Sequence, residues 1–492
     1  MYFLRPIRAT EKAARYTRCV VGFSALVLSA NAIAGEWTIS PRVDVEQSFT
    51  DNVRSVSEGL EADIITSSSA GISVAGQGRR AQLNFNYSLS RDDFWDNSEL
   101  NGLRQNLLGS GNVEAIEDLV FIDTRASISQ QSLQRNGGTS ASDRNIDSND
   151  QSTVVNYSVT PNFGHRYGNW GESDLRYTFN ETRFLDSDVG SAGAQPDTSR
   201  SHEIVTLLRS GPKFTSLSWQ LLGSRTFTDN SSNRNLTELS GEYAWSRHIT
   251  LLGRAGSEKI EGGGINSDDG AEFFWRGGAR LTPGPRTSLR FEVGKRFNST
   301  NYSADASYQI GARTALTTSY EESVQTDRQQ LTNNLNNLVL NDQGVLVDPN
   351  TGAPGNLNSL DLDFLDRVNK NKTFSIALNG ERGRNTFNIF SRVNLRTQEP
   401  EGTEDTVVTL GGSINRRIWP KMDGGISANL SVVTQAADGN EDYTLRTNAF
   451  LTYRIMQDFS GSLNYSFLRR DSDIDTQDVQ ENVVSVSLRK TF

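Results

Sequence analysis

Cysteine is almost absent from this chain of 492 residues, because the single one, Cys19, lies in the amino-terminal leader region. Without that region the chain has no thiol, which excludes disulfides, thiolate metal sites and a cysteine nucleophile. Histidine is nearly as scarce, with three residues, and no phosphate loop, dinucleotide fingerprint or metal-ligand spacing occurs. We therefore expect no catalytic residue, no metal site and no cofactor, and we expect that the protein is not an enzyme.

Long apolar runs are also missing from a chain that is only 35% hydrophobic and carries a formal charge of −10. The longest run, residues 20–30, follows basic residues and precedes the small-x-small sequence Ala32-Ile33-Ala34. This is the pattern of a secretory signal peptide, and the run is shorter than the roughly 20 residues of a transmembrane helix. We expect a signal peptide over 1–34 and a mature chain from Gly35.

In place of long apolar runs, the sequence has short segments in which apolar and polar residues alternate. Ala81, Leu83, Phe85, Tyr87 and Leu89 are separated by Gln82, Asn84, Asn86 and Ser88, and about 22 such segments follow one another. Each is near the 9–11 residues that a tilted membrane strand needs, and this regularity argues against a disordered chain. The sequence predicts one all-β domain over 35–492, a transmembrane antiparallel up-and-down β-barrel of about 22 strands, with 18 or 20 as alternatives.

The connections between these segments alternate in length. Tight links fall at 76–80, 211–214, 282–286, 311–313, 381–384 and 455–457, and long polar links at 50–63, 92–102, 132–151, 185–201, 258–270, 324–371, 397–404 and 470–479. Because outer-membrane barrels have short periplasmic turns and long extracellular loops, this alternation predicts which end of each strand faces the periplasm.

The carboxyl terminus indicates the same class of protein. Val484, Val486, Leu488 and Phe492 share one face of the last segment, which resembles the assembly signal of outer-membrane barrels, although Lys490 stands where an aromatic is common. We expect an integral protein of the bacterial outer membrane. Its expected partners are outer-membrane lipid, lipopolysaccharide and the barrel assembly machinery, and no nucleic acid.

Arginines recur on the polar faces of the predicted strands. The candidates for lining the lumen are Arg125, Arg176, Arg225, Arg290, Glu292, Arg296, Arg392, Arg396 and Arg446. One interpretation is a cationic channel for anionic or polyhydroxylated solutes. The other is a wall braced by ion pairs with carboxylates, and the two are compatible.

The link 324–371 is unusually apolar for a surface loop. Leu360, Leu362, Phe364 and Leu365 are candidates for a constriction inside the barrel, and residues 360–368 have the pattern of a short helix. The segment is too broken for us to expect further strands in it. A lid packed on the outer rim is the alternative to a constriction.

The first strands resemble a known family. Residues 37–41 (WTISP), 43–46 (VDVE), 49–53 (FTDNV), 63–66 (DIIT) and Gly71-Ile72 are similar to the start of outer-membrane β-barrels encoded with PEP-CTERM/exosortase systems. The resemblance covers about 40 residues and implies a link with exopolysaccharide production and surface sorting. It implies no catalytic residues.

Together these features predict an outer-membrane channel or accessory protein for exopolysaccharide export, associated with PEP-CTERM surface sorting. Exopolysaccharide is then a further expected partner. Two alternatives remain: a general diffusion porin, and a structural barrel that displays acidic, adhesive loops.

Overall fold

The computed structural model describes residues 35–132, 140–141, 151–185, 198–229, 232–261, 271–297, 299–326, 368–398, 402–435 and 439–492, with short pieces at 329–330, 333, 339–340 and 346–347. Twenty-two strands form one antiparallel sheet in which each strand pairs with the next along the chain. They are β1 (Gly35–Thr50), β2 (Asp63–Gly78), β3 (Ala81–Phe94), β4 (Gly102–Ile116), β5 (Val120–Ser132), β6 (Gln151–Arg166), β7 (Gly171–Leu185), β8 (Ser199–Ser210), β9 (Leu217–Thr228), β10 (Asn233–Ala244), β11 (Ile249–Glu261), β12 (Glu272–Gly284), β13 (Thr287–Arg296), β14 (Ser299–Gly311), β15 (Thr314–Thr326), β18 (Val368–Arg382), β19 (Asn385–Gln398), β20 (Thr403–Trp419), β21 (Met422–Thr434), β22 (Glu441–Met456), β23 (Phe459–Ser472) and β24 (Val479–Thr491).

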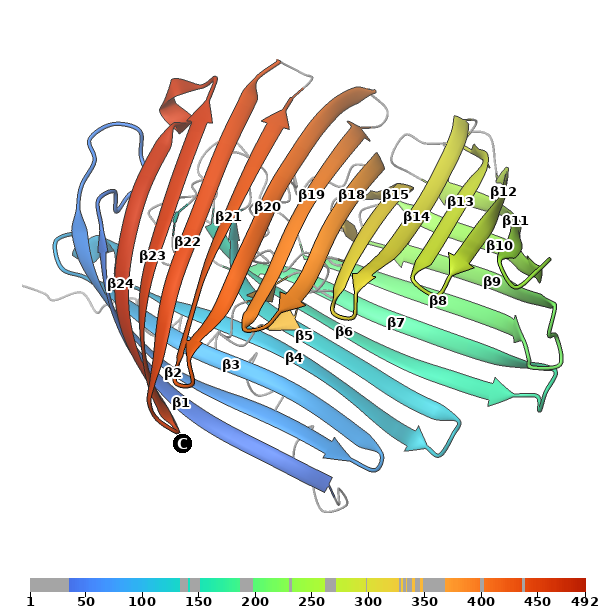
Figure 1. The fold of residues 1–492 in the computed structure, drawn as a ribbon, viewed down its shortest axis with the longest axis horizontal. Helices are drawn as coiled ribbons and strands as arrows, with labels where there is room; N and C mark the ends of the chain where they lie inside the picture. The colour runs from blue at the N-terminus through green and yellow to red at the C-terminus, as the bar shows by residue number, and fades with distance from the viewer. Residues whose placement is uncertain are drawn as a thin grey trace, which may run out of the picture.

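The sheet closes on itself. β1 pairs with β24 from Arg42 opposite Thr491 to Thr50 opposite Val483, and Figure 1 shows the red β24 beside the blue β1. A sheet whose first and last strands are hydrogen-bonded has no free edge and is therefore a barrel. The predicted all-β barrel and its count of 22 strands are confirmed, and the alternatives of 18 and 20 are wrong.

The alternation seen in the sequence becomes two different faces of this barrel. On β24, Val484, Val486 and Leu488 are 43%, 53% and 48% exposed, whereas Ser485 between them is buried. Leu463 and Tyr465 on β23 lie opposite Val486 and Val484 and are exposed in the same way. An exposed apolar face on a closed barrel is the face that meets lipid. No helix among the described residues is long and apolar enough to span a membrane.

Short turns lie at one end of the barrel and longer links at the other. The short end holds the turns 79–80, 117–119, 167–170, 211–216, 245–248, 285–286, 312–313, 383–384, 420–421 and 457–458, which is the periplasmic end of the predicted orientation. The opposite end carries the longer links, with three exceptions. The links 229–232, 297–298 and 399–402 are short, so the expected strict alternation of lengths is wrong at β9–β10, β13–β14 and β19–β20.

The link predicted at 324–371 is shorter than expected, because β15 continues to Thr326 and β18 begins at Val368. It also contains two short paired strands, β16 (Val339–Leu340) and β17 (Leu346–Val347), so the expectation of no further strands was wrong. The constriction candidates Leu360, Leu362, Phe364 and Leu365 lie outside the described residues, as does the predicted signal peptide 1–34.

Two small apolar clusters stabilise the loop end of the barrel. Val53, Ile65, Phe94 and Leu100 are at most 3% exposed and join the links that follow β1 and β3. A second cluster joins Ile260 of β11 to Val324 of β15 and Val368 of β18, with Phe297 of the short β13–β14 link packed against it.

Candidate functional site

The polar face of β10–β13 holds a dense set of charged side chains. On β13, Arg290, Glu292 and Arg296 alternate with the exposed Leu289 and Phe291, so they point into the lumen as predicted from the sequence. Neighbouring strands add further arginines and glutamates at the same face. We call this set the charged wall; it consists of Arg234, Glu238, Glu242, Arg254, Glu258, Arg276, Arg280, Arg290, Glu292 and Arg296.

Two buried carboxylates connect the charged wall across four strands. Glu258 of β11 accepts hydrogen bonds from Arg234 of β10 at 2.6 Å and from Arg296 of β13 at 2.8 Å. Glu292 of β13 pairs with Arg254 of β11 at 2.9 Å and with Arg290 at 2.6 Å. Both glutamates are 1% exposed. A buried carboxylate needs such partners, since removing it from water is costly, and two guanidinium groups each supply them here.

Arg276 lies in the middle of this wall and differs from its neighbours. It is 9% exposed and stands between Arg254 on β11 and Gly294 on β13. A side chain at Gly294 would come within 2.7 Å of the Arg276 Cα, so glycine is needed there. No described residue forms an ion pair with Arg276. Glu272 lies opposite Glu258, and Asp305 of β14 lies opposite Arg290, so this part of the lumen carries both signs of charge in similar number.

The other predicted lumen residues are spread around the barrel and do not join the charged wall. Arg396 pairs with Asp405 at 3.1 Å, both almost fully buried, and Arg176 pairs with Asp174 at 3.3 Å. Arg125 and Arg392 also lie on the lumen face of their strands, since the cross-strand partners of Arg392 are Ser375 and Thr409. Arg446 lies opposite the buried Leu468, and its Nε has no hydrogen-bond partner among the described residues.

The prediction for Arg225 is wrong. Arg225 shares its face of β9 with the exposed Leu221 and Phe227, and its guanidinium lies 4.5 Å from the centre of the Phe227 ring. It therefore points out of the barrel. β9 has leucines on both faces, so the alternation there does not separate lipid from lumen, and a long arginine near the strand end reaches toward polar headgroups.

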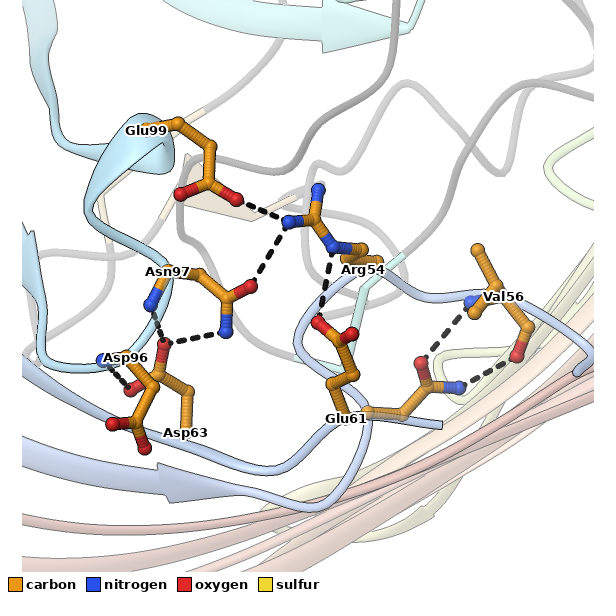
Figure 2. Close-up of polar contacts among 8 residues, drawn as sticks. Arg54, Val56, Glu61, Asp63, Asp96, Asn97 and Glu99 are labelled. Atoms are coloured by element: carbon orange, nitrogen blue, oxygen red, sulfur yellow. Dashed lines mark hydrogen bonds and ion pairs between the residues drawn. The ribbon is translucent and has the colours of Figure 1, made fainter. Parts of the chain in front are cut away.

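A polar cluster at the loop end was not predicted from the sequence. Asp63, the first residue of β2, accepts hydrogen bonds from the backbone N–H and the side-chain amide of Asn97, both at 3.0 Å. It also accepts one from the backbone N–H of Asp96 at 3.1 Å, as Figure 2 shows. One carboxylate thus fixes the link 95–101, which continues into the 3-10 helix η2 (Ser98–Leu100).

Arg54 completes this cluster from the link between β1 and β2. Figure 2 shows its guanidinium between Glu61, at 3.2 Å, and Glu99, and it also donates to Asn97 at 2.9 Å. The hydrogen bonds of Glu99 and Glu61 raise the pKa of Arg54. The backbone N–H of Glu99, and then Arg54, lower the pKa of the Glu99 carboxyl. Together with the apolar cluster of Val53, Ile65, Phe94 and Leu100, this network holds two loops in a defined conformation at the loop end of the barrel.

A third loop reaches the same region. Glu481 on β24 is fully buried and accepts hydrogen bonds from the Thr50 hydroxyl at 2.8 Å, the Ser140 hydroxyl at 3.0 Å and the Ala141 backbone N–H at 2.7 Å. Ser140 and Ala141 belong to the link between β5 and β6, several strands away from β24. This link therefore extends to the closing seam of the barrel, which no local sequence signal indicated.

The predicted assembly signal lies on the outward face of β24. Phe492 is 70% exposed, and its backbone N–H donates to the Pro41 carbonyl of β1 at 2.8 Å. Its position at the end of the closing strand is the interfacial position expected of this residue. Within the part of the chain that the structure describes, no three histidine, cysteine or acidic side chains come together to hold a metal ion.

Comparison with solved structures agrees with this geometry. The barrel is similar to the siderophore receptor PirA from Acinetobacter baumannii, with a TM-score of 0.53 and 11% identity over 94% of this chain and 81% of that one. It is also similar to the apoprotein form of the FrpB iron transporter from Neisseria meningitidis, with a TM-score of 0.51 and 11% identity over 95% and 82%. No family model and no curated protein matches the chain.

Sequence identities this low show the fold alone. The fold is that of integral outer-membrane β-barrel proteins, and the chain is an integral outer-membrane barrel of this class. The predicted localisation is therefore confirmed, whereas the resemblance to barrels of PEP-CTERM systems stays a prediction.

Proposed function

We propose that this barrel is a passive outer-membrane conduit, or an accessory of one, for a hydrated exopolysaccharide that is exported with PEP-CTERM surface sorting. The observation that carries the proposal is the closed barrel of 22 strands with a charged, hydrogen-bonded inner face. Barrels of 16–18 strands already leave an aqueous channel, and a wider one has room for a polymer. The resemblance of the first strands to the PEP-CTERM-associated family supports the choice of substrate.

The charged wall supplies the chemistry that such a conduit needs. Fixed ion pairs such as Glu258 with Arg296 keep the wall polar without presenting a strong field of one sign, so a hydrated chain can slide past it. Arg276, the wall arginine that forms no ion pair with a described residue, favours sugars that carry acidic groups. No step in this mechanism needs an enzyme, a metal or a cofactor. Lipopolysaccharide, membrane lipid and the assembly machinery are the other partners that we propose, and nucleic acid is not among them.

Ordered loops over the mouth supply a way to prevent leakage. The links that contain Arg54, Asn97 and Ser140 are hydrogen-bonded to one another or to the seam between β24 and β1, and we propose that they narrow this sector of the opening. The link 327–367 stays our candidate for further closure, with Leu360, Leu362, Phe364 and Leu365 as its apolar residues.

Planar-bilayer recording of the purified protein tests the proposal. Conductance is measured first in salt alone and then with neutral dextran or a polyuronate added on the periplasmic side. Polymer-dependent blocking events whose duration grows with polymer length support a conduit. A large steady conductance that polymers do not alter contradicts it and supports a general diffusion porin. No conductance in a folded protein, before and after deletion of residues 327–367, also contradicts it and leaves a display role.

A further inference from the structure

Five consecutive turns at the periplasmic end each carry a cation. The turns from β10–β11 to β20–β21 have the sequences WSRH, PR, AR, GR and PK, and none contains an acidic residue. Their cationic side chains are all exposed. We call this set the periplasmic collar; it consists of Arg247, Arg286, Arg313, Arg384 and Lys421.

Hydrogen bonds between neighbouring hairpins hold these turns in a continuous rim. The carbonyls of Arg286, Arg313, Arg384 and Lys421 accept backbone N–H groups of the next hairpin, at 2.7, 3.0, 3.1 and 2.8 Å. Because adjacent strands are about 4.8 Å apart, successive turns along the rim are separated by about 10 Å. The collar is therefore a regular array of positive charges rather than a set of independent loops.

Little within the protein neutralises this array. Arg313 pairs with Glu381 at 2.7 Å. The side chains of Arg247, Arg286, Arg384 and Lys421 form no ion pair with any described residue. Solvated surface charges are common, but an arc of this length without alternating sign is a surface for an anionic partner.

Outward-facing aromatic residues precede several of the collar cations on the same strands. Tyr243 and Tyr308 are outward-facing aromatics, 49% and 48% exposed, at the positions where such residues mark the membrane interface. Arg247 and Arg313 follow them by four and five residues in the direction of the periplasm. Trp245 and Trp419, 69% and 61% exposed, lie two residues before Arg247 and Lys421, so the membrane interface comes close to these turns. Membrane phosphates are for this reason tested against a soluble partner in the experiment.

We propose that the periplasmic collar is the docking site of a polysaccharide that carries a carboxylate at regular intervals. The spacing of the turns is similar to the length of two sugar units, so in a polyuronate, which carries a carboxylate on every sugar, every second carboxylate lies beside a collar cation. The proposal rests on the proposed conduit function and names its substrate class. Docking at the collar presents the chain end to the lumen, where the polar wall around Arg276 continues the path.

Binding of a labelled polyuronate, alginate, to the full protein in phosphatidylcholine nanodiscs tests the collar. The variant replaces all five collar cations by glutamine. The matched control replaces five outward cations at the opposite end of the barrel, Arg91, Lys259, Lys295, Lys372 and Arg469, by glutamine, with the same change in net charge. We expect alginate binding that weakens with salt, no binding of neutral dextran, and affinity roughly 10- to 100-fold lower in the collar variant only.

Several outcomes would overturn the proposal. These are the absence of alginate binding, an equal loss in both variants, and binding of dextran as strong as that of alginate. A collar that instead enriches phosphatidylglycerol in mixed nanodiscs, without binding alginate, is a lipid site, and the polysaccharide proposal is then wrong. Passage of dextran through the channel without alginate binding supports the conduit and contradicts docking at the collar. Alginate binding without passage of any polymer supports docking at the collar and contradicts the conduit.

Discussion

The hydroxyl of Thr50 on β1 donates a buried hydrogen bond of 2.8 Å to the carboxylate of Glu481 on β24, which joins the first and last strands of the barrel. Replacing Glu481 by alanine leaves this hydroxyl and the Ala141 N–H without their acceptor. We expect a loss of about 1–3 kcal/mol in stability, because an unsatisfied buried donor costs that much. Urea unfolding in detergent measures it. Glu481→Gln retains one acceptor oxygen and should lose less; equal losses would contradict the assigned role.

Removing the carboxyl-terminal aromatic should reduce assembly. Phe492 closes the last strand against Pro41 and exposes its ring to the interface, so Phe492→Ala should lower the amount of folded protein in outer-membrane fractions. Heat-modifiable migration of these fractions measures the folded amount. Thr491→Ala, at the neighbouring position on the lumen face, is the control. Normal levels of the Phe492 variant would mean that the terminal strand is recognised by other residues.

Adjacent residues on β23 should respond differently to the same substitution. Leu463 is 49% exposed on the lipid face, whereas Asn464 lies on the lumen face opposite Ser485. Leu463→Arg should cost about 2–4 kcal/mol of stability, the cost of an arginine near the membrane midplane. Asn464→Arg should be tolerated. Denaturant unfolding of the two variants in parallel decides whether the faces are assigned correctly.

Neutralising one buried glutamate of the charged wall should change both stability and ion selectivity. Glu292→Gln removes the carboxylate that pairs with Arg290 and, among the described residues, leaves Arg254 with only Glu238, at 3.6 Å; breaking such a buried pair costs about 3–5 kcal/mol. The wall also becomes more positive, so the reversal potential under a salt gradient should shift toward anions. Glu381→Gln, at the exposed periplasmic rim, should be milder in stability. An unchanged selectivity would show that current does not pass this wall.

Acidification should loosen the loops over the mouth. The pKa of Glu99 is lowered in the folded protein from its ordinary value of 4.5, by its backbone N–H and by Arg54. Its contribution to stability is therefore present above pH 4.5 and is lost as the pH falls through the folded-state pKa. Hydrogen exchange of residues 95–101, corrected for intrinsic rates, should increase over that interval. Glu99→Gln should exchange faster at all pH values, and a persisting transition in this variant would assign the effect to another carboxylate.

The strand pattern could be predicted because the residues of each strand indicate by themselves which of its faces meets lipid and which meets the lumen. Alternating residues such as Ala81 to Leu89 need no knowledge of their neighbours to indicate a lipid face, and the short turns fix the direction of each strand. For the same reason the count of strands and the outward position of Val484 and Phe492 followed from the sequence. The prediction of a face was wrong for Arg225, where β9 has apolar residues on both sides.

Contacts between distant strands could not be predicted in this way. The bond between Arg296 and Glu258 joins β13 to β11, and the contact of Ala141 with Glu481 joins residues 340 positions apart. Each contact depends on the register of several intervening strands or on the path of a loop. The alternation of apolar and polar residues along one strand gives no information about either. The cluster of Arg54, Asp63 and Asn97 depends on turn geometry in two separate links. In the sequence these residues therefore could not be distinguished from other polar loop residues.

The pairing of Arg42 with Thr491 also limits how the protein can be made. This contact spans nearly the whole chain, so no amino-terminal fragment can complete the barrel, however much of it has folded. Until β24 pairs with β1, the first strand and the last strand formed both present unpaired backbone groups, which are templates for aggregation. Ring closure between such distant partners is also a slow event. The bacterium therefore has to keep both edges protected until synthesis and export of the entire chain are finished.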